Sequence, residues 1–255
     1  MLSAVVDEGM MRRLNRPVKL DETLSVRRLL LGLQAVVFDL DGTLLDRRLS
    51  FEQFMRDQCR RFSRELQSVD ETEYVRTLVE LDRDGYAPRS ELFAGTLARV
   101  GLPADLAETL LRDYRTGFAD ACVLFPDAAA TLAALRAAGL KLGLITNGSV
   151  RMQSAKLKCL ALSPAFDTIL ISDAEGVSKP DPEIFRRALE RLGTDPEHAV
   201  FVGDHTEVDV GGAQGAGMKA VWRRDRVSSR SVEADAIIDE LGDLLPLLGL
   251  ERIEL

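Results

Sequence analysis

Cysteine, histidine and aromatic residues are scarce in this chain of 255 residues, which has three cysteines, two histidines and 5 % aromatic side chains. Cys59, Cys122 and Cys159 form no C-x-x-C pair, and an odd number cannot all pair within one chain. This usage argues against a disulfide framework and against a zinc site. We therefore predict three free thiols and a reducing, cytoplasmic location.

An apolar run long enough to cross a bilayer is also missing. The run at 29–38, "LLLGLQAVVF", follows two arginines as in a signal peptide, but it contains Gln34 and ends at Asp39. A membrane span needs about 20 apolar residues. We expect no membrane partner. The second half of the run predicts a core strand, and residues 1–33 are an N-terminal extension with no assigned structure.

The chain has no surplus of positive charge. Lys and Arg number 33 against 41 Asp and Glu, which gives a net charge of −8. Such a chain repels phosphates over most of its surface, so we expect no nucleic-acid partner. A small anion can still bind where a cation or local basic residues receive it. The 46 % hydrophobic and 29 % charged residues are typical of a globular protein, and we expect a monomer or a homodimer.

Short apolar runs alternate with helical patterns over most of the chain. The runs that predict strands lie at 35–39, 140–146, 168–172, 199–204 and 218–222, with a weaker candidate at 236–238. Helical patterns cover 126–138 and a segment that starts at Asp181-Pro182 and stops at Gly193. This alternation predicts an α/β fold, with a parallel sheet and helices on both faces.

Residues 48–120 break the alternation because they contain no good strand. Ser50 and Gln53 form a predicted capping box, and a second helix carries Tyr74, Leu78 and Leu81. Two further helices are predicted from Ser90 and Pro103. We therefore predict an all-helical cap domain at 48–120, inserted into a catalytic core made of 34–47 and 121–255.

Polar residues follow the strong strands, where the carboxyl ends of a parallel sheet meet and ligands bind. In chain order they are Asp39, Asp41, Thr146, Asn147, Asp204 and Asp209, with Lys179 just before the helix that starts at Asp181-Pro182. Folding should bring these groups to one edge of the sheet.

Carboxylates crowded at one edge repel one another unless a cation lies between them. Mg²⁺ prefers carboxylates, phosphate oxygens and water, and with Lys179 it would let the site accept an anion. Asp39 can then attack phosphorus, and Asp41 can protonate the leaving oxygen and later activate water. That acid role requires a raised pKa for Asp41, which a crowd of acids can supply. Thr146 and nearby backbone N–H groups can bind the phosphoryl oxygens. The pattern predicts metal-dependent phosphoryl transfer.

Four segments carry a resemblance to a known family. "DLDGTLLD", "LITNGS", "KPDPEIF" and "VGDHTEVD" resemble, in order and spacing, the signature motifs of the haloacid dehalogenase superfamily. The order and spacing are similar to those of phosphatase-type members with a helical cap inserted after the first motif. The resemblance runs from about residue 34 to residue 225 and implies a Rossmann-like core.

The resemblance also implies a role for each motif residue. Asp39 would be the nucleophile and Asp41 the acid/base, with Thr146, Asn147 and Lys179 binding the phosphoryl group of a small phosphorylated metabolite. Mg²⁺ would be held by Asp39, Asp204 and the Asp41 backbone carbonyl, while Asp209 would orient metal-bound water. His205 departs from the pattern, because relatives often carry Ser or Thr there.

Three alternatives stay open beside the phosphatase. A phosphomutase would share Asp39 and Asp41, although Thr43 argues against it because such mutases often carry an aliphatic residue at that position. The second alternative is a true haloacid dehalogenase. The third is a non-catalytic binding protein on this fold, which should have lost a motif residue, yet none is missing. "GGAQGAG" at 211–217 does not fit a dinucleotide fingerprint, and we interpret its small residues as allowing a helix to pack closely on the sheet.

Overall fold

The computed structural model describes residues 32–85, 87–224 and 233–252. Six strands form one parallel sheet in the order β3-β2-β1-β4-β5-β6. Their bounds are β1 Ala35–Phe38, β2 Lys141–Thr146, β3 Thr168–Ile171, β4 Ala199–Gly203, β5 Lys219–Arg223 and β6 Ala236–Ile238. The six predicted strands and the α/β fold are thus confirmed. Most of the predicted extension lies outside the described residues.

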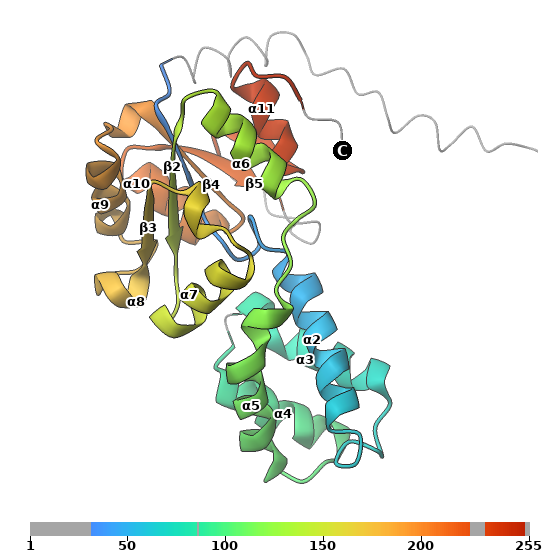
Figure 1. Ribbon diagram of the computed structural model, residues 1–255. Coiled ribbons are helices and arrows are strands. Elements are labelled where there is room, and N and C mark those ends of the chain that lie inside the picture. Colours follow the sequence, from blue (N-terminus) through green and yellow to red (C-terminus); the bar gives the residue numbers. More distant parts are fainter. Residues whose placement is uncertain (1–31, 86, 225–232, 253–255) are drawn as a thin grey trace, which may run out of the picture.

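Helices cover both faces of the sheet (Figure 1). On one face, α6 (Ala128–Ala137), α7 (Val150–Cys159) and α11 (Leu244–Leu247) pack on alternate strand residues such as Val36 and Phe38. On the other face, α9 (Pro182–Leu192) and α10 (Gly212–Gly215) pack on Val37 and its neighbours. A short helix, α8 (Ser172–Glu175), follows β3 directly. Because strand side chains alternate between faces, each strand contributes to two separate hydrophobic clusters.

The α9 helix shows how local sequence sets an element. Asp181 is its N-cap and accepts a hydrogen bond from the Glu183 N–H at 2.9 Å, with Pro182 at the first helical position. Gly193 ends the helix with a positive φ of 59°, which glycine adopts without strain. In between, Phe185 is fully buried against Phe201 of β4, with ring centroids 5.1 Å apart. Burial of one such side chain contributes roughly 1.5–3 kcal/mol.

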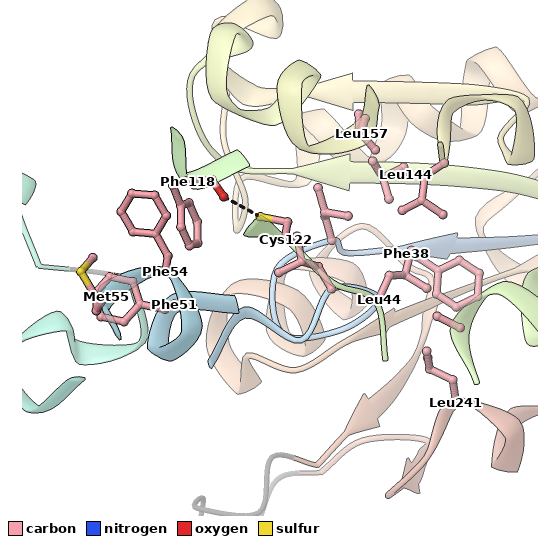
Figure 2. Packing of buried hydrophobic residues seen from close by; sticks show 14 of the residues in the cluster. Phe38, Leu44, Phe51, Phe54, Met55, Phe118, Cys122, Leu144, Leu157 and Leu241 are labelled. Atoms are coloured by element: carbon pink, nitrogen blue, oxygen red, sulfur yellow. Dashed lines mark hydrogen bonds between the residues drawn. The ribbon is translucent and has the colours of Figure 1, made fainter. Parts of the chain in front are cut away.

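Four helices follow β1 and form a bundle beside the sheet (Figure 1). They are α2 (Arg47–Arg61), α3 (Glu71–Asp82), α4 (Arg89–Val100) and α5 (Leu106–Gly117). Phe51 and Phe54 of α2 pack against Tyr114 and Phe118 with ring centroids 5.8–6.3 Å apart. Figure 2 shows Phe51, Phe54 and Phe118 together, with Cys122 Sγ donating to the Phe118 carbonyl. The boundaries of a separate cap domain at 48 and 120 stay a prediction.

The predicted capping box at Ser50 and Gln53 is wrong. The N-cap of helix α2 lies four residues earlier, because the Asp46 side chain accepts from the Leu49 N–H at 2.9 Å and caps the first turn. Ser50 lies inside the helix. Its hydroxyl donates to the Asp46 carbonyl at 2.6 Å and accepts from the Val123 N–H at 3.0 Å. Ser50 therefore ties together the two chain segments that join the helical bundle to the sheet.

Helix α10, which contains part of "GGAQGAG", contacts β5 of the sheet, but its closest approach is to a helix: a Cβ on Gly212 would lie 2.8 Å from the Phe185 ring of α9. All three cysteines are free thiols, with Cys59 and Cys122 buried and Cys159 exposed. Within the described part of the chain, no helix is both long enough and apolar enough to span a membrane.

Candidate active site

The predicted site residues meet at the carboxyl ends of three neighbouring strands. Asp39 follows β1, Thr146 ends β2 and Asp204 follows β4, and β1 lies between the other two strands. The chain changes direction across the sheet at β1, and such a switch point is where open α/β sheets bind ligands. The sheet order, which the sequence did not give, is therefore what brings these three side chains together.

Three carboxylates gather around one ammonium. Asp39, Asp204 and Asp209 each place an oxygen within 4.8 Å of the others. Lys179 Nζ lies 2.6 Å from Asp39 Oδ1 and 2.7 Å from Asp209 Oδ1, with its side chain 2 % exposed. One positive charge thus faces three acids, of which Asp39 and Asp209 are buried and Asp204 is partly exposed, so the site holds an excess of negative charge.

This excess of negative charge shifts the pKa values of the acids. Burial raises the pKa of Asp39 to about 7, against the lowering effect of Lys179, and the charges of Asp209 and Asp41 raise it further. Burial also raises the pKa of Asp204 well above its usual range, with Asp39 and Asp209 adding to the effect. Burial alone would lower the pKa of Lys179, but Asp209 and Asp39 raise it, so the ammonium stays charged. Two acids that resist ionisation beside a cationic lysine indicate a place for a further cation.

The donor set and its shape fit a small hard cation. Asp39 Oδ2 is buried and has no hydrogen-bond partner among the described residues. A Cβ on Gly42 would overlap the Asp204 carboxylate, and a Cβ on Gly203 would overlap the Asp209 side chain. Only glycine at these positions allows the carboxylates to approach so closely. A site that offers carboxylate oxygens alone, without nitrogen or sulfur, suits Mg²⁺ rather than zinc.

Asp41 is held apart from this cluster by two residues of α7. Lys156 Nζ lies 2.7 and 2.8 Å from the two Asp41 carboxylate oxygens, and Gln153 Nε2 donates to Asp41 Oδ2 at 2.9 Å. The same Gln153 amide donates to Thr146 Oγ1. The side chains of Lys156 and Gln153 thus connect the predicted acid/base to the predicted phosphoryl-binding hydroxyl.

The expectation that neighbouring acids raise the pKa of Asp41 is wrong for this arrangement. Burial does raise it, but the charge and hydrogen bond of Lys156, the hydrogen bond of Gln153 and the charge of Arg47 together lower it below the usual range. The sequence analysis missed Lys156 and Gln153. The available signal was their spacing: two polar residues three apart on the same face of a helix as buried Leu157.

Asn147 fixes the segment that carries Lys179. Its amide nitrogen donates to the Lys179 carbonyl at 2.9 Å, and its amide oxygen accepts from the Lys179 N–H at 3.0 Å. Both ends of the Asn147 amide are therefore used on this backbone. Lys179 lies in a loop 32 positions after Asn147 along the chain, and these two hydrogen bonds help to hold its ammonium next to Asp39.

The departure at His205 has a structural explanation. His205 precedes the π-helix η6 (Thr206–Gly211), and its Nδ1 accepts from the Glu207 and Val208 N–H groups at 3.2 and 3.1 Å. Ser and Thr cap helices in the same way through a side-chain oxygen. The His205 N–H also donates to Asp209 Oδ2 at 3.0 Å, so this turn orients the carboxylate behind Lys179.

Known proteins of similar sequence and structure give independent information on this chain. The model of the haloacid dehalogenase-like hydrolases matches residues 33–217. The chain is 33 % identical over 228 residues to the glyceraldehyde 3-phosphate phosphatase of Pyrococcus furiosus, covering 86 % of this chain and 95 % of the relative. It is 44 % identical over 149 residues to the phosphoserine phosphatase of Thermus thermophilus, covering 58 % and 57 %. The crystal structure of a HAD phosphatase from Thermococcus onnurineus is similar at 34 % identity, with a TM-score of 0.60 and coverage of 87 % and 100 %.

Proposed function

The chain belongs to the haloacid dehalogenase-like hydrolases and is a phosphoric monoester hydrolase, and on that premise we propose that it cleaves a small phosphorylated metabolite with Mg²⁺ through an aspartyl-phosphate on Asp39. The observation that carries the proposal is the state of Asp39. One carboxylate oxygen is paired with Lys179, while the other is buried without a partner at the switch point of the sheet. That second oxygen is the proposed nucleophile.

The first half of the reaction transfers the phosphoryl group to the enzyme. Asp39 Oδ2 attacks phosphorus, the phosphorus–oxygen ester bond breaks, and Asp41 gives its proton to the leaving oxygen. The bound phosphoryl dianion raises the pKa of Asp41 and competes with it for Lys156, so that the carboxyl can hold this proton. Lys179 and the Thr146 hydroxyl bind the phosphoryl oxygens.

The second half releases phosphate. Asp41, now ionised and held by Lys156 and Gln153, takes a proton from a water molecule that attacks the same phosphorus. The Asp39–phosphorus bond breaks and the free carboxylate returns to its ion pair with Lys179. Asp204, the Asp41 backbone carbonyl and the Asp39 oxygen that does not attack phosphorus would hold the cation, with Asp209 behind them. When bound, Mg²⁺ neutralises charge on the phosphoryl oxygens.

The remaining parts of the chain fit this reaction. Helices α2–α5 would act as a cap that closes over the substrate and excludes water. Mutase and dehalogenase activities are alternatives that an assay can separate. We place the enzyme in the cytoplasm, which the free thiols of all three cysteines support. We also propose that it is a monomer or a homodimer.

Phosphate release from p-nitrophenyl phosphate tests the proposal. We expect turnover with Mg²⁺, its loss in excess chelator, and inhibition by Ca²⁺, which takes more ligands at longer distances. Chloride release from a 2-chloro acid is measured in parallel and should be absent. Full activity in chelator would contradict the metal assignment, and chloride release without phosphate release would contradict the phosphatase.

A further inference from the structure

Arg47 lies where the helical bundle meets the catalytic loop. The Leu45 carbonyl accepts from the Gly42 N–H at 2.9 Å and from the Arg47 N–H at 2.8 Å. The first residue of α2 is therefore fixed directly beside the loop that carries Asp41.

The Arg47 side chain is buried with hydrogen-bonding capacity left over. It is 12 % exposed, and its Nη1 lies 2.6 Å from Asp82 Oδ2. Its Nη2 is buried and finds no acceptor among the described residues. The bundle also makes room for this guanidinium, since a Cβ on Gly85 would lie 2.8 Å from Arg47 Nε. A buried donor without an acceptor is unfavourable, so its retention calls for an explanation.

The ion pair with Asp82 accounts for Nη1, and the Phe51 ring, 5.4 Å from the guanidinium carbon, covers one face of the group, but neither contact accounts for Nη2. Asp82 already pairs with Arg89, whose Nη2 also donates to the Gly85 carbonyl at 2.8 Å. One buried carboxylate therefore faces two guanidinium groups, and one of them would suffice to neutralise it. The second positive charge stays uncompensated next to Asp41, which has its own partner in Lys156.

We infer that Arg47 binds a carboxylate on the leaving group, so that the substrate is a phosphorylated hydroxy acid rather than a neutral phosphorylated alcohol. This rests on the proposed function, because the phosphoryl group occupies the Asp39 side of the site. Arginine suits the task because its guanidinium stays charged when buried, and Nη2 can donate to a substrate carboxylate while Nη1 keeps its ion pair with Asp82. Since Arg47 Nη2 and Asp39 Oδ2 are both covered, the substrate enters while the cap helices are displaced, and closure then surrounds its two ends.

The test compares two substrates with the same two-carbon skeleton on the full-length enzyme. In 2-phosphoglycolate the leaving group ends in a carboxylate, and in 2-hydroxyethyl phosphate it ends in a hydroxymethyl group. We expect wild type to favour 2-phosphoglycolate in kcat/KM, and Arg47→Met to reduce that preference by about 10–100-fold, as for one charge-assisted hydrogen bond. Arg61→Met is the matched control: Arg61, on the same helix, pairs with Asp113 and lies 4.9 Å over Phe54, and its loss should leave the preference unchanged.

The outcomes are distinct. If neither compound nor p-nitrophenyl phosphate is hydrolysed, the proposed phosphatase fails. If hydrolysis occurs but wild type shows no preference for 2-phosphoglycolate, the role of Arg47 is refuted without any variant. An equal loss of preference in Arg47→Met and Arg61→Met would also refute it. Should Arg47→Met fold poorly, Arg47→Lys keeps a cation beside Asp82 but lacks the second nitrogen of the guanidinium, and a loss of preference is again expected.

Discussion

Lys156→Met separates the charge of Lys156 from its packing. Methionine keeps most of the apolar stem and removes the ammonium that lies 2.7 and 2.8 Å from the Asp41 oxygens. The Lys156 side chain is 7 % exposed and that of Asp41 is 20 % exposed, so the pair is largely shielded from water. Loss of a hydrogen bond to such a charged group costs about 2 kcal/mol of stability, which is below the cost for a fully buried pair because Asp41 keeps Gln153 and some solvent.

The catalytic loss follows from the role of Asp41. A positioned acid/base increases the rate of turnover about 10²–10⁴-fold. An Asp41 carboxylate that is held by Gln153 alone is less well positioned and should lose part of this rate enhancement. We expect turnover of p-nitrophenyl phosphate to fall by about 10–100-fold in Lys156→Met. Lys158→Met, two residues along the same helix and exposed, is the control and should behave as wild type.

The pH dependence of stability gives a second measurement. The Asp41 pKa is depressed in the folded state, so the ion pair stabilises the fold above the ordinary aspartate pKa of 3.8 and is lost as pH falls through the lower folded value. In urea unfolding, the difference in free energy of unfolding between wild type and Lys156→Met should therefore be largest at pH 7 and should decrease below pH 4. A gap that is constant with pH, together with unchanged turnover, would refute this account of Lys156.

Three further changes test other parts of the site. With Mg²⁺ present, Asp39→Asn should abolish turnover. In chelator it should raise Tm by an amount that grows from pH 4 to 7, because the raised folded-state pKa of about 7 makes wild type lose stability as the pH rises from 3.8 to that value; an unchanged Tm at pH 7 would contradict this. Gly42→Ala should weaken Mg²⁺ activation at least tenfold by displacing Asp204, whereas Gly211→Ala, which meets only ordinary contacts, should not. Asp41→Asn should slow an alkyl phosphate by about 10²–10⁴-fold and an aryl phosphate less, because phenolate needs no proton to leave; equal losses would argue against an acid.

Strand ends were the most informative part of the sequence. Asp39, Thr146 and Asp204 each follow a short apolar run, and parallel strands place such residues at one edge whatever their order. The order itself, with β1 between β2 and β4, depends on long-range pairing that local patterns do not record. Sequence reasoning therefore identified the residues of the carboxylate cluster without being able to show that they touch.

Helix contacts were harder to predict for physical reasons. The start of α2 was misplaced because Ser50 resembles an N-cap in sequence, while Asp46 makes the cap and Ser50 joins two linkers. Lys156 and Gln153 lie on a helix whose pattern alone predicts exposed polar residues, and only the tertiary placement of that helix, in contact with the turn Phe118–Ala121, turns them toward Asp41. Tertiary contacts overrode local preference at both places.

Chemical trapping of the intermediate tests the central claim most directly. The enzyme is mixed with p-nitrophenyl phosphate and Mg²⁺, quenched during turnover and reduced with borohydride, which converts an aspartyl-phosphate to homoserine; peptides are then read by mass spectrometry. The account predicts homoserine at residue 39 and at no other aspartate, with none when substrate is omitted. Homoserine at a different position, or an unmodified Asp39 in enzyme that is turning over, would contradict covalent catalysis by Asp39.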